Sequence, residues 1–234
     1  METGKTGKYF KYAIGEIVLV VLGILIALQI NNWNEERKAK IKSIDYHSRL
    51  IEDLDRTTKS SKNLNETAHK VLSALKHTID LLITQQTPTT EDIEKMDYAL
   101  IWVNRFNFQF SELSTFDEMK SNGDISLIYN LETRNNLVNF KEYVVSVDAI
   151  FNRLGASIAN SNIFNKHILS RVDPETLEIT NHYNFMELAN DNEFINELSK
   201  FSVHWRGNAW FTKQVEQKAK NLKNSLLEDL DELQ

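Results

Sequence analysis

"YAIGEIVLVVLGILIALQI", Tyr12 to Ile30, is the strongly apolar run of a 234-residue chain whose mean hydropathy is only −0.40. As a helix, its roughly 19 residues extend about 28 Å, close to the ~30 Å hydrocarbon core of a bilayer. We therefore expect residues 12–30 to form a transmembrane helix. A basic N-terminal tail, residues 1–11, precedes it, and a large polar-surfaced region follows it.

Aromatic residues flank this run, as expected where amphipathic rings lie at the two membrane interfaces. The expected interface anchors are Tyr9, Phe10 and Tyr12 at one end and Trp33 at the other. The alternative is a cleaved signal peptide, with the lysines of the tail as its basic leader. The exit sequence "ALQINNW" has no small residue two positions after Ala27, so it favours an uncleaved span.

Positive charge is nearly balanced across the span, because Arg37, Lys38, Lys40 and Lys42 follow it and three lysines precede it. The N-terminal lysines lie closer to the apolar run and belong to a short tail. The positive-inside rule therefore favours a cytoplasmic N-terminus and a translocated helical domain.

An acidic residue, Glu16, stands inside the apolar run. At about 100° per residue, Glu16, Val20, Gly23 and Ala27 fall on one narrow face of the helix. Gly23 and Ala27 form a small-xxx-small pair that lets a second helix approach closely, and an ionisable residue in a span normally faces protein or water. We expect these four residues to form the membrane association face of a homo-oligomer.

Three interpretations of Glu16 stay open. It is a polar contact in that oligomer, or it lines a proton or ion path. In the third interpretation it lies only about one turn inside Tyr12 and snorkels to the headgroups at little cost.

The rest of the chain favours helices, since two prolines and seven glycines leave little material for hairpins. We predict an all-α fold in which the transmembrane helix is followed by an antiparallel bundle of long helices with short connecting helices. Residues 31–84 form a long coiled-coil-like juxtamembrane helix, and residues 85–234 form the remainder of the bundle. The predicted heptad-like seam comprises Ile44, His47, Ile51, Leu54, Thr58, Ser61, Asn65, Ala68, Leu72, Leu75, Ile79 and Leu82. Its polar middle, "RTTKSSKNLNET", is expected to face water or a weak partner surface.

Local signals mark the following elements. Pro88 and a threonine cap predict a helix that runs to about Val103. "NRFNFQF", residues 104–110, is interpreted as an extended linker whose phenylalanines fill the core. A short helix over residues 113–121 is expected to end at Asn122 and Gly123 in a left-handed cap, with Asp124 capping the next helix.

The C-terminal part predicts two more long helices. The first runs from Leu131 to Val172, where Asp173 and Pro174 stop it. Its predicted core positions are Leu137, Phe140, Val144, Val147, Ile150, Phe151, Leu154 and Ile158. After a loosely structured stretch, Asp191 caps a final helical region, residues 194–233, with a kink expected at Gly207.

Catalytic, cofactor and metal motifs are missing from the sequence. Cysteine is absent, and the six histidines form neither an H-E-x-x-H motif nor repeated Glu-x-x-His pairs. "HWRGNAW", residues 204–210, is interpreted as a helix kink packed with Trp205 and Trp210. Basic residues are interspersed with acidic residues throughout, which gives no patch for nucleic acid. We predict a protein that is not an enzyme and has no cofactor.

Two blocks carry a resemblance to a known family. "KYAIGEIVLVVLGILIALQINNWNEERK" and "STFDEMKSNGDISLIYN" resemble the opening signature and central motif of a family of uncharacterised single-span membrane proteins common in Bacteroidota, a domain of unknown function. The resemblance implies a bacterial inner-membrane protein with a helical soluble region. It implies no activity, so no functional residue is carried over.

Two functions follow as hypotheses. The first is a membrane-anchored, non-enzymatic module that oligomerises in the lipid bilayer and acts as a scaffold, sensor or assembly protein for an unknown protein partner. The alternative is a homo-oligomeric membrane channel or proton-responsive device that uses Glu16.

Overall fold

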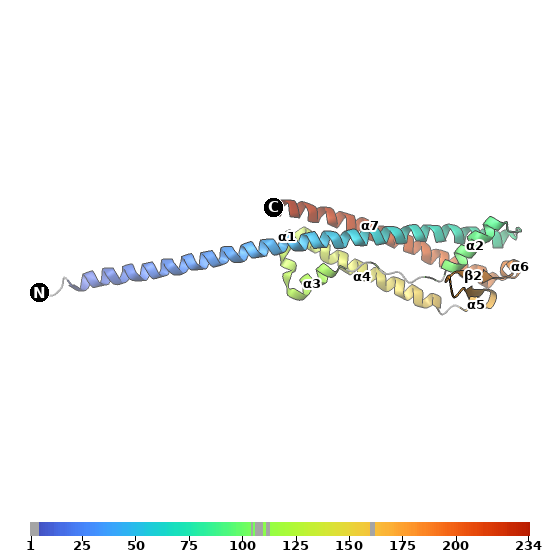
Figure 1. Ribbon diagram of the computed structural model, residues 1–234, viewed down its shortest axis with the longest axis horizontal. Coiled ribbons are helices and arrows are strands. Elements are labelled where there is room, and N and C mark those ends of the chain that lie inside the picture. Colours follow the sequence, from blue (N-terminus) through green and yellow to red (C-terminus); the bar gives the residue numbers. More distant parts are fainter. Residues whose placement is uncertain (1–4, 104, 106–109, 111–112, 160–161) are drawn as a thin grey trace.

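The computed structural model describes residues 5–103, 105, 110, 113–159 and 162–234, without the side chains of residues 5–13 and 157–159. Figure 1 shows a helix, α1 (Lys5–Thr84), that runs the length of the molecule. Its second half packs with α4 (Leu131–Ala159) and α7 (Asn192–Leu233) into a narrow bundle. The predicted all-α fold of long antiparallel helices is confirmed.

Helix α1 is continuous over 80 residues, or about 120 Å. The predicted transmembrane helix, residues 12–30, and the predicted juxtamembrane helix, residues 31–84, are therefore one uninterrupted helix. Its N-terminal part projects beyond the bundle (Figure 1), and residues 14–30 are all exposed. The helix ends at Thr84, and the next residue, Gln85, takes a left-handed conformation with φ of 52°.

The bundle is built on the pairing of α1 with α7, which lie side by side and run in opposite directions (Figure 1). Buried residues recur at spacings of four and three on both helices, which keeps one stripe of each facing the other. On α1 they are Ser43, His47, Leu50, Leu54, Thr57, Ser61, Ala68, Val71, Leu75, Thr78 and Leu82. On α7 they are Phe194, Leu198, Phe201, Trp205, Asn208, Thr212, Val215, Ala219, Leu222, Leu226 and Asp229.

The predicted seam consists of two lines of residues with a spacing of seven, one from His47 to Leu82 and one from Ile44 to Ile79. The prediction was correct for the first line. The line from His47 to Leu82 is buried, but the second line lies one residue earlier than predicted. Leu50 and Val71 are fully buried, whereas Ile51 is only half-buried. The direction from which α7 approaches decides between these neighbouring positions, and the apolar pattern of α1 alone does not contain that direction.

The polar middle of α1 was expected to face water or a weak partner surface, and it packs against α7 instead of facing water. Thr57 and Ser61 are fully buried. Asn65 Nδ2 donates to the carbonyl oxygen of Ala209 at 2.6 Å and to Thr212 Oγ1 at 3.2 Å. Small and hydrogen-bonding residues on α7 let the two helices approach here. Thr57 and Asn65 form hydrogen bonds inside the bundle, whereas the hydroxyl of Ser61 has no hydrogen-bond partner among the described residues.

Helix α4 packs on α7 through Thr133, Leu137, Phe140, Val144, Val147 and Phe151. Five of these six residues were predicted core positions. Ile150 and Leu154 are half-buried, and the side chain of Ile158 lies outside the described residues. Phe110 is buried against Phe151, as predicted, at a ring separation of 5.9 Å, whereas Phe106 and Phe108 lie outside the described residues.

Three predicted caps were correct and one was wrong. Thr89 and Asp92 form a capping box at the start of α2 (Thr90–Trp102). Gly123, with φ of 75°, ends α3 (Ser114–Asn122), and Asp191 caps α7. Asp124 instead begins a 3₁₀ helix, η1 (Asp124–Leu127), and Asn130 caps α4 by accepting from the N–H groups of residues 132 and 133.

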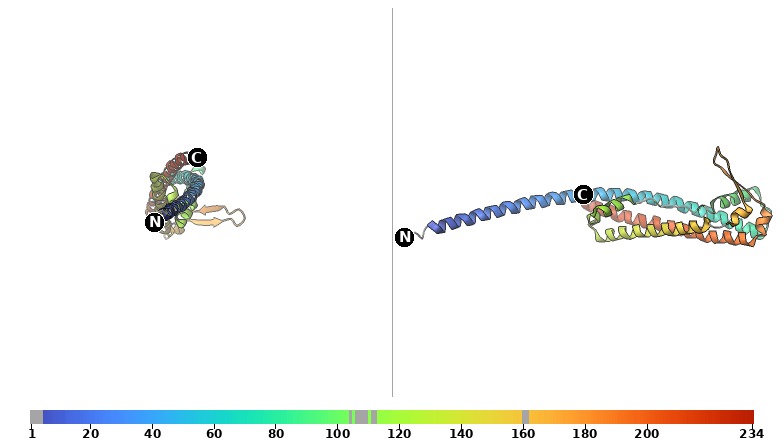
Figure 2. Two further views of the ribbon diagram at one scale, coloured as in Figure 1. Left: turned by 90° about the vertical axis from the view of Figure 1, so that its left-hand side faces the viewer. Right: turned by 90° about the horizontal axis from the view of Figure 1, so that it is seen from below.

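The helix predicted over residues 131–172 is wrong in its last part. Helix α4 ends at Ala159, α5 (Ile163–His167) follows, and β1 (Leu169–Val172) pairs antiparallel with β2 (Ile179–His182). Asp173 directly follows β1 and begins the turn of this hairpin, where its carboxylate accepts hydrogen bonds from two backbone N–H groups. Figure 2 shows this hairpin protruding from the end of the bundle far from the N-terminus. The short α6 (Phe185–Ala189) leads into α7, which continues through Gly207 without a break.

Candidate functional site

The predicted association face lies on the projecting part of α1. Because α1 is helical throughout, the spacing of Glu16, Val20, Gly23 and Ala27 places these residues on one face, and all four are exposed in the protomer. A side chain added at Gly23 would meet no atom within 4 Å among the described residues. A second helix can therefore reach this face without rearrangement of the bundle.

The projecting part of α1 also has the length and apolar composition of a membrane span. Within the described residues one helix is long and apolar enough to cross a membrane, and its apolar window lies near the N-terminus with no part buried. Of the predicted interface anchors, Trp33 is exposed at the end of this window. The side chains of Tyr9, Phe10 and Tyr12 lie outside the described residues.

A cluster of charged and polar residues, here called the collar, joins one side of α1 to α3 and η1 where the bundle begins. Asp124 Oδ2 lies 2.7 Å from Lys42 Nζ and accepts a hydrogen bond of 2.8 Å from the hydroxyl of Tyr46. Arg49 forms a two-point pair with Glu118. The ammonium of Lys42 lowers the pKa of Asp124, and the guanidinium of Arg49 lowers the pKa of Glu118. These contacts hold α3 and η1, which contain the second quoted block, against α1.

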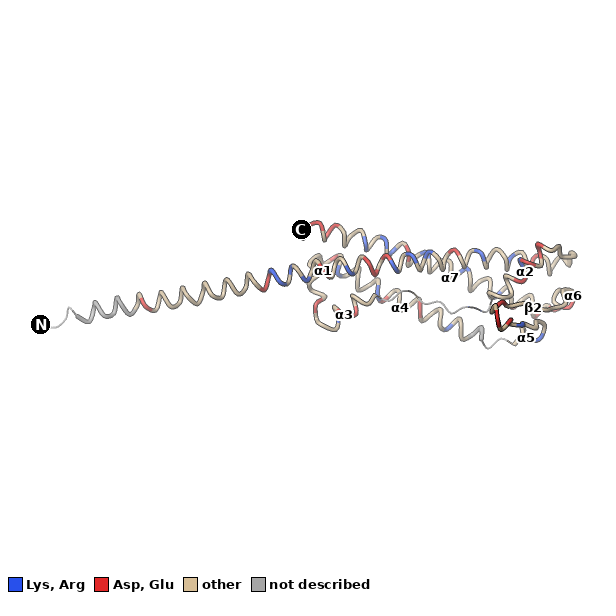
Figure 3. The backbone as a smooth tube through the Cα atoms, in the orientation of Figure 1, with Lys and Arg blue, Asp and Glu red and all other residues tan. Residues whose placement is uncertain are grey.

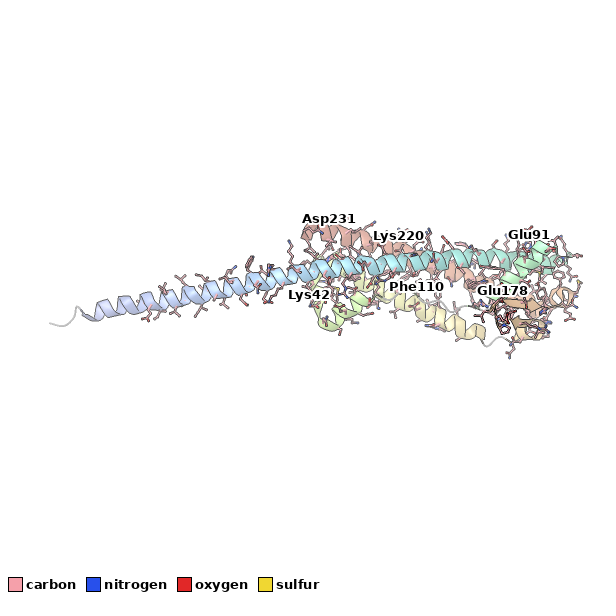
Figure 4. All side chains as sticks on the ribbon, in the orientation of Figure 1. Lys42, Glu91, Phe110, Glu178, Lys220 and Asp231 are labelled. Atoms are coloured by element: carbon pink, nitrogen blue, oxygen red, sulfur yellow. The ribbon has the colours of Figure 1, made fainter. Side chains whose placement is uncertain are left out.

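Charge is distributed differently along the two parts of α1. In Figure 3 the projecting part is mostly uncharged, whereas Lys, Arg, Asp and Glu of both signs crowd the part that enters the bundle. Figure 4 shows Lys42 and Asp231 at the same end of the bundle, so the C-terminal end of α7 returns to the collar. This end of the bundle faces the apolar part of α1.

Two histidines at the far end of the bundle pair with capping aspartates. His77 Nε2 lies 2.6 Å from Asp92 Oδ1, and His167 Nε2 lies 2.7 Å from Asp191 Oδ2. The hydroxyl and N–H of Thr89, followed by His77, lower the pKa of Asp92 to about 2. Both aspartates cap helices, so the two pairs stabilise the starts of α2 and α7. No three His, Asp or Glu side chains gather into a metal-binding group anywhere in the described part of the chain.

Of the two tryptophans in the stretch 204–210 that were predicted to pack into the core, one does so. Trp205 is fully buried, and its indole N–H donates to the carbonyl oxygen of Val103 at 3.3 Å. Trp210 is 56% exposed and makes an edge-to-face contact with Phe211. The prediction that Trp210 packs into the core is therefore wrong. Trp210 lies outside the buried stripe of α7, which explains the difference.

One buried polar group was missed as a site by sequence reasoning. His47 was assigned only to the heptad seam, but it faces Asp229 near the C-terminus, with 4.0 Å between Nε2 and Oδ2. Asn130 donates to the other oxygen of Asp229 at 2.8 Å. The three residues lie far apart in the sequence. Only their polar character at positions of the apolar pattern could have indicated a shared site.

Comparison with known proteins identifies a family. A family model described as "Family of unknown function (DUF6090)" matches residues 16–199, which include most of α1, the collar and the start of α7, and the chain belongs to this family. No curated protein and no solved structure matches the chain.

Proposed function

We propose that this DUF6090 protein is a membrane-anchored, non-enzymatic helical module that acts as an oligomeric scaffold, sensor or assembly protein. Its apolar segment would cross the inner membrane of a bacterium, in keeping with the Bacteroidota resemblance, with the N-terminus in the cytoplasm and the bundle in the periplasm. The observation that carries the proposal is the continuity of α1 from Lys5 to Thr84. A helix without a break transmits tilt and rotation between its ends, so a partner at the bundle would be coupled to the membrane.

The length of α1 sets the distance between the bundle and the bilayer. The predicted span ends at Ile30, and the first fully buried residue of the bundle is Ser43. The intervening helix rises about 20 Å, which is more than the thickness of one headgroup layer. The collar and bundle would therefore stand in water above the membrane, where a protein partner can reach them.

Self-association is the second part of the proposal. A surface of apolar side chains with Gly23 and Ala27 on one face is unpartnered within the described protomer. In a bilayer, close backbone approach at small residues is a main source of helix association. The lipid bilayer and further copies of the chain are thus the proposed partners of the projecting helix, while the bundle is the surface available to a different protein.

The anchor is tested with the full chain expressed in a bacterium. Wild-type protein should remain in the membrane after alkaline carbonate extraction. Leu22→Arg combined with Leu25→Arg should release it into the soluble fraction, because each central arginine opposes insertion by about 3 kcal/mol. Both leucines are exposed and outside the bundle, so the circular dichroism spectrum should not change.

The matched control is Ile41→Arg combined with Ile83→Arg. These residues are apolar, similarly exposed and on the same helix, but they lie outside the proposed span. This variant should stay in the membrane. Extraction of the wild-type chain by carbonate, or retention of the Leu22 and Leu25 variant, would show that the apolar segment is not a membrane anchor.

A further inference from the structure

A cavity of about 130 Å³ lies at the end of the bundle that faces the apolar part of α1. The C-terminal end of α7, marked by Asp231 in Figure 4, returns here to α1 and to the start of α4. The cavity is lined by His47, Tyr129, Asn130, Asp229, Glu232 and Leu233. It is independent of the predicted association face and does not rest on the proposed function.

The surroundings of His47 show that one ring nitrogen, Nδ1, carries a proton. Nδ1 lies 2.8 Å from the backbone carbonyl oxygen of Ser43, and a carbonyl oxygen can only accept a hydrogen bond. The hydroxyl of Ser43 donates its own hydrogen to the carbonyl oxygen of Leu127 at 2.7 Å. Nδ1 therefore carries a proton, and in the neutral form of the imidazole Nε2 presents its lone pair to the cavity.

Asp229 presents a second acceptor to the same space. Its Oδ1 atom accepts from Asn130 Nδ2, and its Oδ2 atom lies 4.0 Å from His47 Nε2. Among the described residues neither Nε2 nor Oδ2 has a hydrogen-bond partner, although residues His47 and Asp229 are only 1% and 9% exposed. When His47 is neutral, these are two buried acceptors that face each other, which is unfavourable unless a donor lies between them.

We propose that this cavity binds a primary ammonium group. One nitrogen placed about 2.9 Å from each atom fits between acceptors 4.0 Å apart and donates to both. The carboxylates of Asp229 and Glu232 supply negative charge, and Tyr129 contributes an aromatic ring, a group that attracts cations, to the lining of the same cavity. The volume equals about four waters, which suits an ammonium with one or two methylenes.

The chemistry of the lining separates this ligand from its competitors. A metal ion would require a third gathered ligand, and the described residues contain no such group. A water molecule could donate to both acceptors but would leave the carboxylate charge uncompensated. The ammonium could belong to a free small amine or to the tip of a lysine side chain.

The test uses the full chain in detergent, with its six histidines labelled with ¹⁵N. Loss of one signal in His47→Gln assigns the His47 imidazole. Methylammonium chloride is titrated at constant ionic strength, with tetramethylammonium chloride as the control because it has charge but no N–H. The Nε2 resonance of His47 should shift saturably with methylammonium and should not with tetramethylammonium.

Paired variants locate the effect. Asp229→Asn should weaken methylammonium binding at least about tenfold, since it removes a charged hydrogen bond. Asp231→Asn, an exposed neighbour on the same helix that does not line the cavity, should bind like the wild type. If Asp229→Asn does not fold, Glu232→Gln replaces it, with a several-fold loss expected.

N-acetyl-lysine N-methylamide distinguishes the two sources of the ammonium. Binding of both compounds identifies a site that accepts a lysine side chain, and binding of methylammonium alone identifies a site for a free amine. The proposal is overturned if neither compound shifts the His47 resonance saturably. It is also overturned if tetramethylammonium produces the same shift, or if a folded Asp229→Asn protein binds methylammonium like the wild type.

Discussion

The carboxylate of Asp53 on α1 accepts a hydrogen bond of 2.9 Å from the backbone N–H of Thr115, 62 residues later in the chain. Leu113, the N-cap residue of α3, makes no side-chain capping bond. The other oxygen of Asp53 pairs with Arg56, and Asp53 is only 1% exposed. A side chain of α1 thus caps α3 from outside and helps to fix the second quoted block in place.

Replacement of this cap should destabilise the bundle. Asp53→Ala leaves the buried N–H of Thr115 without an acceptor, and we expect the free energy of unfolding to fall by about 2 kcal/mol in urea denaturation. Asp55→Ala is the control, because Asp55 is exposed and pairs with Lys223 at 2.7 Å on the surface. Asp55→Ala should lower the free energy of unfolding by only about 0.5 kcal/mol. Equal losses would show that the Asp53 cap adds nothing beyond a surface ion pair.

The two tryptophans of the stretch 204–210 should differ strongly. Trp205→Ala removes a fully buried ring and should lower the free energy of unfolding by about 3 to 5 kcal/mol. Trp210→Ala changes an exposed ring on the same helix and should stay within about 0.5 kcal/mol of the wild type. Thermal unfolding followed by circular dichroism separates them. A large loss at Trp210 would indicate that its exposed face is covered by another molecule.

The association face is tested by moving a bulky residue around the projecting helix. Gly23→Ile should lower the oligomeric state in detergent, because association there depends on backbone approach. Gly15→Ile is the control. It lies about 100° away from the face, and a side chain at either glycine meets open space in the protomer. Mass measurement of the detergent-solubilised chain gives the stoichiometry, and an unchanged mass for Gly23→Ile would exclude this face.

Glu16→Gln distinguishes the interpretations of Glu16. In a packed oligomer the amide keeps the shape and hydrogen bonding of the acid, so the oligomer should persist. If Glu16 instead works in a proton or ion path, the same variant should abolish conductance or the response to pH while the oligomer remains intact. Planar bilayer recording of the wild type and Glu16→Gln measures this. A monomeric wild type with Glu16 open to water-soluble reagents would support snorkelling.

The orientation of the chain is tested with a reporter fused after Gln234. Alkaline phosphatase should be active there, because the short basic tail is expected to stay in the cytoplasm while the bundle is translocated. A fluorescent protein that matures only in the cytoplasm should be dark at the same position. The opposite pair of signals would place the bundle in the cytoplasm.

Acid should weaken the start of α2. The Thr89 contacts and His77 lower the pKa of Asp92 from 3.8 to about 2, so the unfolded chain binds this proton more tightly. The stability that Asp92 contributes is therefore present above about pH 4 and is lost as the pH falls towards 2. The difference in unfolding temperature between pH 5 and pH 3 should shrink in Asp92→Asn. Asp80→Asn, an exposed aspartate on α1, should keep the wild-type difference.

Local signals were sufficient for elements whose determinants are close in sequence. The capping box at Thr89, the left-handed Gly123 and the cap at Asp191 each depend on a few neighbouring residues, and each was predicted correctly. The hairpin was missed because strands of four residues carry too little alternation to be distinguished from the helical pattern before them.

The sequence by itself determined that the chain has one exposed apolar helix segment and that its remaining long helices carry apolar stripes, since hydrophobic periodicity is a property of consecutive residues. The tertiary structure alone decided the second buried line of α1, from Ser43 to Thr78, because that line depends on the direction from which α7 approaches. It also brought His47 and Asp229 to 4.0 Å. These residues lie on helices that run in opposite directions, so their meeting depends on the register of the two helices, which no local pattern contains.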